Sequence, residues 1–146
     1  MKIAVASDHA GFHFKEKLIP FLTESGHEVQ NFGCYNAESC DYPDYGIPAA
    51  KSVAEKKNER AILICSNGIG MSMLANKIPG IIGALGYNLN TAKTTRKHHN
   101  SNVLCLGAEQ NPPGLLLKMV ESWLTTEFEG GRHERRINKV MVLDNK

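Results

Sequence analysis

Short hydrophobic runs alternate along this chain with longer stretches in which apolar residues recur every three or four positions. The short runs predict strands at 2–7, 27–32, 61–65, 81–85 and 103–106. The longer stretches predict helices at 11–25, 47–57, 71–77, 90–97 and 114–125, and a charged helix towards 142. Pro20 argues against a regular last turn in the first helix. Residues 33–46 are rich in polar and turn-forming types and are predicted to be a loop.

Strand and helix alternate throughout this pattern, which is typical of a parallel sheet joined by right-handed crossovers. We therefore expect an α/β fold, a three-layer α/β/α sandwich around a Rossmann-like parallel sheet of about five strands. Residues 1–146 are expected to form a single domain whose segment 131–146 is a helical arm. Such sheets bind ligands beyond the carboxyl ends of their strands, so functional residues should directly follow strands.

Composition and charge exclude several classes of protein. Apolar residues make up 42% of the 146 positions and the formal net charge is +2, with no basic stripe of the kind that binds nucleic acid. No apolar run approaches the ~20 residues that a membrane span needs, and the N-terminal run is too short for a signal peptide. We expect a cytoplasmic protein without nucleic-acid or membrane partners. The four cysteines form no Cys-x-x-Cys pair, which argues against zinc-ribbon and thioredoxin-type sites.

The segment Cys65-Ser66-Asn67-Gly68-Ile69-Gly70 follows the third predicted strand. Its glycines allow backbone N–H groups to face a ligand, and the positive end of the following helix would stabilise an anion there. The same field lowers the pKa of a thiol and makes Cys65 a candidate thiolate base. The alternative is a structural turn with a buried cysteine. The segment lacks the third glycine and the downstream acid of a dinucleotide site, so no nicotinamide cofactor is expected.

Three further groups could take part in such chemistry. Asp8 and His9 follow the first strand and could bind sugar hydroxyls and an anion, or Asp8 could simply cap a helix. His98 and His99 precede the fifth strand; adjacent histidines lack metal-pair spacing, and a histidine suits proton transfer, although a solvated helix end is equally compatible. Arg132 and Arg136 lie four apart and could hold a phosphate, or could belong to a solvated charged face.

These groups together suggest proton abstraction beside a carbonyl on a phosphorylated small molecule, and several motifs add a family resemblance. From about residue 2 to 137 the chain resembles the ribose-5-phosphate isomerase B family, which includes allose- and galactose-6-phosphate isomerases. The matching motifs are Ser7-Asp8-His9-Ala10-Gly11, Asp41-Tyr42-Pro43-Asp44-Tyr45, Cys65 with Gly68 and Gly70, Ala75-Asn76-Lys77, His98 with Asn102-Val103-Leu104, and Glu129-Gly130-Gly131-Arg132-His133.

The resemblance implies a role for each matching residue. Cys65 would carry the proton between C1 and C2 of the sugar, and His98 would be the acid that helps to open the furanose ring. The implied substrate-binding residues are Asp8, His9, Tyr42, Ser66, Asn67, Gly68, Ile69, Gly70, His99, Arg132 and Arg136, with the two arginines on the phosphate. The family needs no metal or cofactor, and its members are homodimers or tetramers in which a neighbouring subunit completes each active site.

Three positions depart from the family pattern. Asn67 stands where the loop usually has a hydroxyl, Ile82 replaces an arginine, and Glu109 replaces an arginine that often contacts the phosphate. We expect interconversion of ribose 5-phosphate and ribulose 5-phosphate through an enediolate. The alternatives are isomerisation of a hexose 6-phosphate, such as allose or galactose 6-phosphate, and a non-catalytic sugar-phosphate-binding protein. Glu109 is expected either to turn away and pair with Lys97 or Arg135, or to bind hydroxyls of another sugar.

Overall fold

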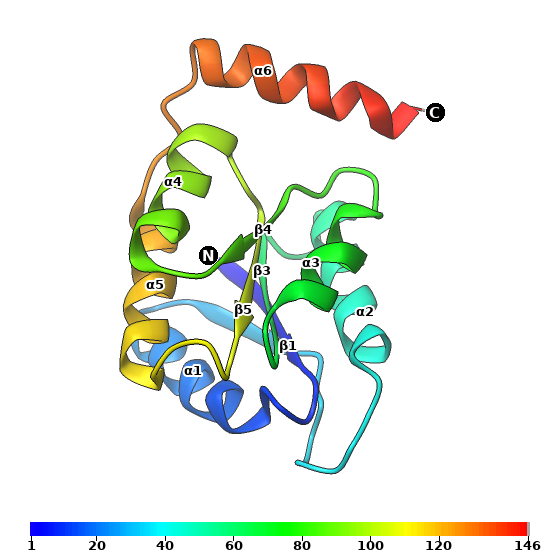
Figure 1. Cartoon of the computed structure of the whole chain (residues 1–146), viewed down its shortest axis with the longest axis vertical. Coiled ribbons are helices and arrows are strands. Elements are labelled where there is room, and N and C mark those ends of the chain that lie inside the picture. The colour runs from blue at the N-terminus through cyan, green and yellow to red at the C-terminus, as the bar shows by residue number, and fades with distance from the viewer. Residues whose placement is uncertain (146) are drawn as a thin grey trace.

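A five-stranded, all-parallel sheet forms the middle layer of the molecule (Figure 1). The computed structural model describes residues 1–145. The strand order is β2-β1-β3-β5-β4, which confirms the predicted parallel α/β sheet. The strands are β1 (Lys2–Ser7), β2 (Glu28–Asn31), β3 (Arg60–Cys65), β4 (Gly83–Gly86) and β5 (Val103–Gly107). The fourth strand begins two residues later than its hydrophobic run predicts, because Ile81 and Ile82 lie in the irregular segment that leads into it.

Helices cover both faces of the sheet, as the three-layer prediction requires. One face packs against α1 (Phe12–Glu24), α4 (Leu89–His99) and α5 (Pro113–Thr125), with Trp123 of α5 fully buried. The other face packs against α2 (Tyr42–Ala54) and α3 (Ile69–Asn76). The three central strands are buried almost throughout, since helices lie on both of their sides.

Two predictions about helices were wrong at their proline residues. Helix α1 continues through Pro20 to Glu24, although proline supplies no N–H to its turn. Helix α2 begins at Tyr42, five residues before the predicted start, and ends at Ala54. Pro43 lies in its first turn, where the missing N–H costs nothing because a first-turn N–H has no intrahelical partner.

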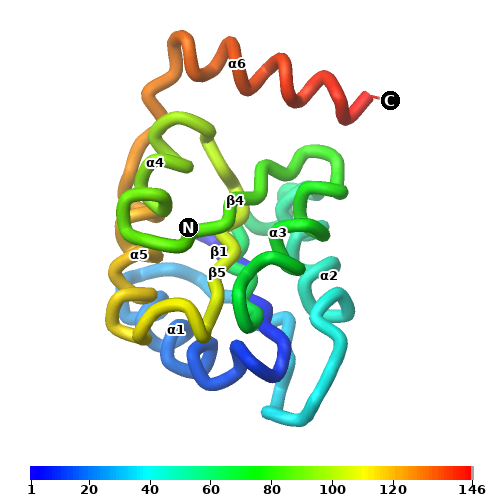
Figure 2. The backbone as a smooth tube through the Cα atoms, viewed as in Figure 1, coloured from blue at the N-terminus to red at the C-terminus, as the bar shows by residue number. Residues whose placement is uncertain are grey.

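The C-terminal helix α6 (Arg132–Met141) lies at one end of the molecule, outside the two helix layers that cover the sheet (Figure 2). It is followed by the short 3₁₀ helix η1 (Val142–Asn145). Helix α6 packs mainly against α4. A hydrogen bond from the Gly80 amide to Asp144 Oδ2, 2.8 Å long, ties η1 to the loop before β4. Both contacts lie at the edge of the sheet where strands begin. Lys146, the last residue of the predicted arm, lies outside the described residues.

Candidate active site

Cys65 is the last residue of β3, between β1 and β5 in the middle of the sheet. Its side chain is 4% exposed, and its Sγ accepts a hydrogen bond from the backbone N–H of Gly68 at 3.2 Å. Gly68 has φ 80°, which favours glycine, and it is the N-cap of α3. A thiolate at this position would therefore be stabilised by a backbone amide and by the positive end of a helix.

Cys105 provides a contrast with Cys65 because it lies on the neighbouring strand β5, within the sheet. Complete burial, and secondarily the nearby Cys65, raises the pKa of Cys105 well above its usual range. A thiol that stays protonated is a poor base and a poor nucleophile. Of these two neighbouring cysteines, Cys65 at the strand end is therefore the better placed for proton transfer.

The residues that follow β1 lie at the same carboxyl edge of the sheet as Cys65. One carboxylate oxygen of Asp8, Oδ1, accepts hydrogen bonds from the amides of Ala10 and Gly11 at 3.0 and 3.1 Å. The other, Oδ2, has no partner within residues 1–145. The carboxylate thus holds the turn before α1 but does not cap the helix, whose N-cap is Gly11 without a side-chain cap. It keeps one oxygen that can accept from a sugar hydroxyl.

The tautomer of His9 follows from its neighbour. The Cys40 amide donates to His9 Nδ1 at 3.2 Å, so the neutral ring carries its proton on Nε2. A half-buried Nε2–H donor beside a strand end is suited to contact an anion.

Three contacts hold the loop from Ser66 to Gly70 in place. The Ser66 carbonyl accepts from the amide of Glu109 at 3.0 Å, and Asn67 Oδ1 accepts from the amide of Ile69 at 3.0 Å. The bond to Ile69 uses the oxygen of the Asn67 amide and leaves its NH₂ group free to donate. A Cβ on Gly70 would come within 2.6 Å of the Tyr42 ring, which shows that Tyr42 packs directly against the loop.

The other predicted residues lie on α4 and α6. The rings of His98 and His133 stack with centroids 4.1 Å apart and planes 8° apart. Glu129 approaches His133 Nε2 at 3.6 Å and Lys97 Nζ at 3.3 Å. A cavity of about 270 Å³ between the two helices is lined by His98, His99, His133, Arg136, Ile137 and Val140.

Arg132 and Arg136 are exposed on α6 and make no ion pair within residues 1–145. Glu129 pairs with Lys97 and contacts His133 instead, so the exposed arginines agree with the solvated-face alternative as well as with an anion site. Two unpaired guanidinium groups one helical turn apart remain available to bind an anion.

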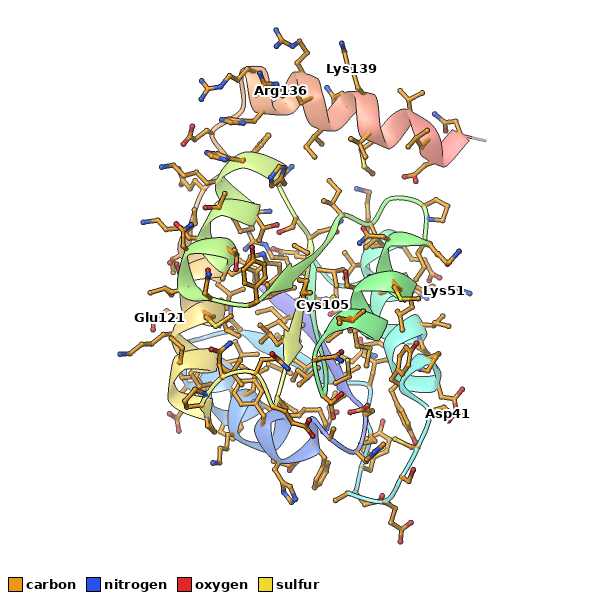
Figure 3. All side chains as sticks on the ribbon, viewed as in Figure 1. Asp41, Lys51, Cys105, Glu121, Arg136 and Lys139 are labelled. Atoms are coloured by element: carbon orange, nitrogen blue, oxygen red, sulfur yellow. The ribbon has the colours of Figure 1, made fainter. Side chains whose placement is uncertain are left out.

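These two groups of residues lie at opposite edges of the sheet. Cys65 pairs with Gly107 where β3 and β5 end, whereas His98 precedes Val103, where β5 begins. Four residue steps of ~3.3 Å place about 13 Å of strand between these edges. In Figure 3, Arg136 on α6 lies at one end of the molecule and Asp41, which precedes α2, lies towards the other. One chain therefore does not bring Cys65 and His98 together.

Glu109 lies beside the loop at the carboxyl edge, through its bond to Ser66. The expectation that it pairs with Lys97 was wrong, because Lys97 lies at the other edge of the sheet and binds Glu129. Glu109 makes no ion pair within the part of the chain that the structure describes.

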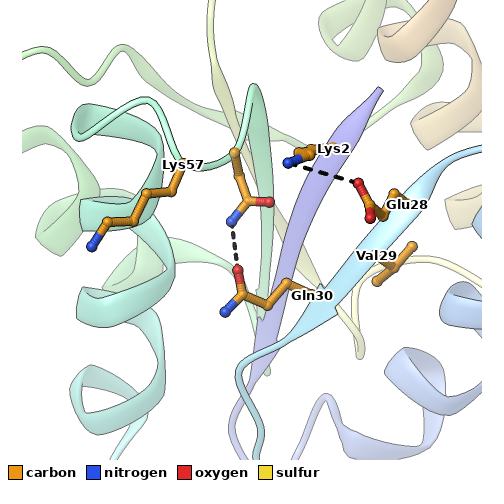
Figure 4. Close-up of a pocket in the computed structure, with 6 residues that line it drawn as sticks. Lys2, Glu28, Val29, Gln30 and Lys57 are labelled. Carbon is orange, nitrogen blue, oxygen red and sulfur yellow. Dashed lines mark hydrogen bonds and ion pairs between the residues drawn. The ribbon is translucent and has the colours of Figure 1, made fainter.

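A further pocket of about 270 Å³ lies over the first residues of β1 and β2, beside the loop that follows α2 (Figure 4). Its polar groups largely satisfy one another, since Lys2 lies 4.0 Å from Glu28 and Asn58 Nδ2 donates to Gln30 at 2.9 Å. None of its residues was predicted to act in the site.

Comparison with known proteins decides the family. The family described as Ribose/Galactose Isomerase matches residues 3–140. The chain belongs to this family. Ribose-5-phosphate isomerase B of Escherichia coli (strain K12) is 35% identical over 145 residues, 99% of this chain and 97% of that protein. A Bacillus subtilis (strain 168) protein, provisionally named a sugar phosphate isomerase, is 44% identical over 147 residues, 100% of this chain and 99% of its own.

Solved structures of the ribose/galactose isomerase family agree closely with this fold. Ribose-5-phosphate isomerase B from Clostridium thermocellum superposes with a TM-score of 0.97 at 41% identity, covering 99% of this chain and 98% of its own. The enzyme from Mycoplasma genitalium, with bound ribulose-5-phosphate, gives 0.95 at 36% identity, covering 99% and 97%. The predicted family resemblance is confirmed, and the chain is a sugar-phosphate isomerase of this family.

Sequence reasoning missed two members of the second group, Glu129 and His133. Both belong to the Glu129–His133 motif, so their family match was visible, but their contact with His98 depends on how α6 packs against α4. No pattern along the chain reports that packing. None of the helices described in residues 1–145 is both long and apolar enough to cross a membrane.

Proposed function

We propose that the chain interconverts ribose 5-phosphate and ribulose 5-phosphate, with Cys65 as the base. The observation that carries this proposal is the Cys65 thiol at the carboxyl end of β3, bonded to the Gly68 amide at 3.2 Å. The Mycoplasma genitalium relative with bound ribulose-5-phosphate supports a pentose phosphate as the substrate.

The Cys65 thiolate removes the proton from C2 of the open-chain aldose, and the electron pair moves towards the carbonyl to form a cis-enediolate. The negative oxygen is stabilised by backbone N–H groups of the loop from Ser66 to Gly70 and by the N-terminus of α3. The same thiol returns a proton to C1 while the proton on O2 passes to O1, which leaves the ketose. Asp8 Oδ2 and the NH₂ group of Asn67 would hold sugar hydroxyls.

His98 acts as the acid that opens the furanose ring. Since His98 and Cys65 of one chain lie at opposite edges of the sheet, His98 has to come from a second copy. The same copy would contribute His99 from α4 and Arg132 and Arg136 from α6. The two arginines, with the Nε2–H donor of His9, would then surround the phosphate.

A two-fold homodimer satisfies this arrangement, because each copy can offer its α6 edge to the carboxyl edge of the other. The exposed apolar side chains fit this pairing. Val140, Val142 and Leu143 are 55–61% exposed on the α6 edge, and Ile69 and Met73 are 50 and 58% exposed on α3 beside the Cys65 loop. Contact between these patches would remove both from water. A tetramer built from such dimers would keep the same shared sites.

The test is an activity assay of the purified protein against a panel of pentose and hexose phosphates, with Cys65→Ala in parallel. Ribose 5-phosphate should give the highest kcat/KM, and the variant should lose activity on every substrate that turns over. A higher kcat/KM for allose or galactose 6-phosphate would assign the hexose reaction instead. Binding without turnover by the unmodified protein would show a sugar-phosphate-binding protein.

A further inference from the structure

Three metal-ligating side chains from three different segments meet between α4 and α6. One donor atom each of His98, Glu129 and His133 lies within 4.8 Å of the others. His98 comes from the end of α4, Glu129 from the segment before α6, and His133 from its first turn. This set of three shares His98 with the adjacent pair His98 and His99, but the spacing of that pair does not suit a shared ion.

A second observation also indicates a ligand at this place. His133 is 8% exposed, and its Nε2 is buried without a hydrogen-bond partner within residues 1–145. Buried polar atoms are paired in the great majority of cases. The Glu129 carboxylate, 3.6 Å away, is too distant for a good hydrogen bond but close enough to share an ion with that nitrogen.

The three donor groups also match a zinc site. Two imidazoles and a carboxylate are a ligand set of zinc sites with an open fourth position.

We propose that His98, Glu129 and His133 bind a divalent transition-metal ion of the zinc type. Imidazole ligands select such ions over Mg²⁺ and Ca²⁺, which prefer all-oxygen sites. Metal–nitrogen bonds of 2.0–2.1 Å place tetrahedral ligands about 3.3 Å apart, so the donor atoms must move together. The stacked rings must also splay from their parallel arrangement. His98 is half-buried and Glu129 exposed, so both side chains have room to rotate.

This ion would be an inhibitor of the reaction and not its cofactor. This consequence rests on the proposed function, in which the His98 imidazole supplies a proton to the furanose ring. A metal bound to that imidazole holds the lone pair of one ring nitrogen, so the ring cannot become the imidazolium that donates the proton. Zinc should therefore slow isomerisation, and a chelator should restore it.

The binding itself is tested without substrate. The tag-free protein is treated with a chelator, dialysed against a slight excess of ZnCl₂, and its bound zinc is measured by elemental analysis. The unmodified chain should retain about one zinc per chain, and Glu129→Gln and His133→Asn should lose it. Because Glu129 is exposed, Glu129→Gln should stay folded by circular dichroism even if His133→Asn does not. His99→Asn, which removes a neighbouring imidazole outside the cluster, should keep the zinc.

Equal zinc in Glu129→Gln and the unmodified chain would overturn the proposal, as would no bound zinc at all. Loss of zinc in His99→Asn would assign the ion to the His98 and His99 pair and would also overturn it. None of these results depends on turnover. An isomerase that binds no zinc therefore refutes only the metal site, and a zinc-binding chain without isomerase activity refutes only the proposed function.

Discussion

The backbone amide of Gly68 donates to the thiol of Cys65 at 3.2 Å, across the turn that joins β3 to α3. Cys65 is the one cysteine in residues 1–145 whose sulfur accepts a hydrogen bond from the N-cap amide of a helix. The loop would then have two tasks, because the amides that stabilise a thiolate lie next to those that would stabilise an enediolate.

Replacing Cys65 by Ala should lower kcat by ~100- to 10,000-fold, the usual contribution of a general base. The fold should persist, since the side chain is small and lies at a strand end. Steady-state kinetics with a thermal melt would check both points. Cys105→Ala is the matched control: it should lower Tm by leaving a cavity, but leave kcat nearly unchanged. Full activity in the Cys65 variant would remove the thiol from the mechanism.

Gly107 should be essential for the position of the loop. A Cβ at this residue would come within 2.7 Å of the Asn67 backbone, which has no flexible end that can yield. Gly107→Ala should therefore displace the loop, and misplacement by about 1 Å can cost on the order of 100-fold in rate.

The control for Gly107→Ala is Gly114→Ala in helix α5, where a Cβ meets nothing within 4 Å. This change should raise stability by about 0.4–1 kcal/mol and leave activity unaltered. Chemical denaturation and kinetics on both variants separate the two effects. A Gly107→Ala enzyme with normal kcat would show that the loop tolerates the shift.

The sequence predicted the sheet well because its strands are buried on both faces and read as continuous apolar runs. It predicted Cys65 and the loop after it for the same reason, since they directly follow such a strand. The start of α2 was missed because Asp41-Tyr42-Pro43-Asp44 has turn-forming composition, although a proline in the first turn is also typical of a helix start.

The sequence could not show that the site residues divide between two edges. Strand-end rules place Asp8 and Cys65 together, but His98 lies at the end of a helix that runs back along the sheet. The position of α6, which brings His133 onto His98, depends on contacts between segments more than thirty residues apart.

Glu109→Arg should lower KM for ribose 5-phosphate and leave kcat almost unchanged, the result of stronger uniform binding. An acid near a phosphate costs about 1 kcal/mol at a partly exposed site, which corresponds to about a fivefold change in KM. Glu121→Arg makes the same charge change on α5 and should leave KM as it is. Damage confined to a hexose phosphate would instead mean that Glu109 binds hydroxyls of that sugar.

His98→Asn should separate ring opening from proton transfer. The variant should convert ribose 5-phosphate slowly, because this sugar is mainly a closed furanose. Exchange of solvent deuterium into ribulose 5-phosphate should persist, because this substrate is open-chain and needs only the Cys65 base. Nuclear magnetic resonance in heavy water measures the exchange directly. Equal loss of conversion and exchange would contradict a role limited to ring opening.

Each active site in the proposed dimer combines Cys65 of one copy with His98 of another. The most direct measurement mixes Cys65→Ala and His98→Asn chains, each nearly inactive alone, under conditions that allow subunits to exchange. Half of the random two-fold dimers would be mixed, and each would hold one intact site, so activity should recover to about a quarter of the unmodified enzyme. Native mass spectrometry confirms that mixed dimers have formed. Mixed dimers that remain as inactive as the separate variants would contradict the shared site.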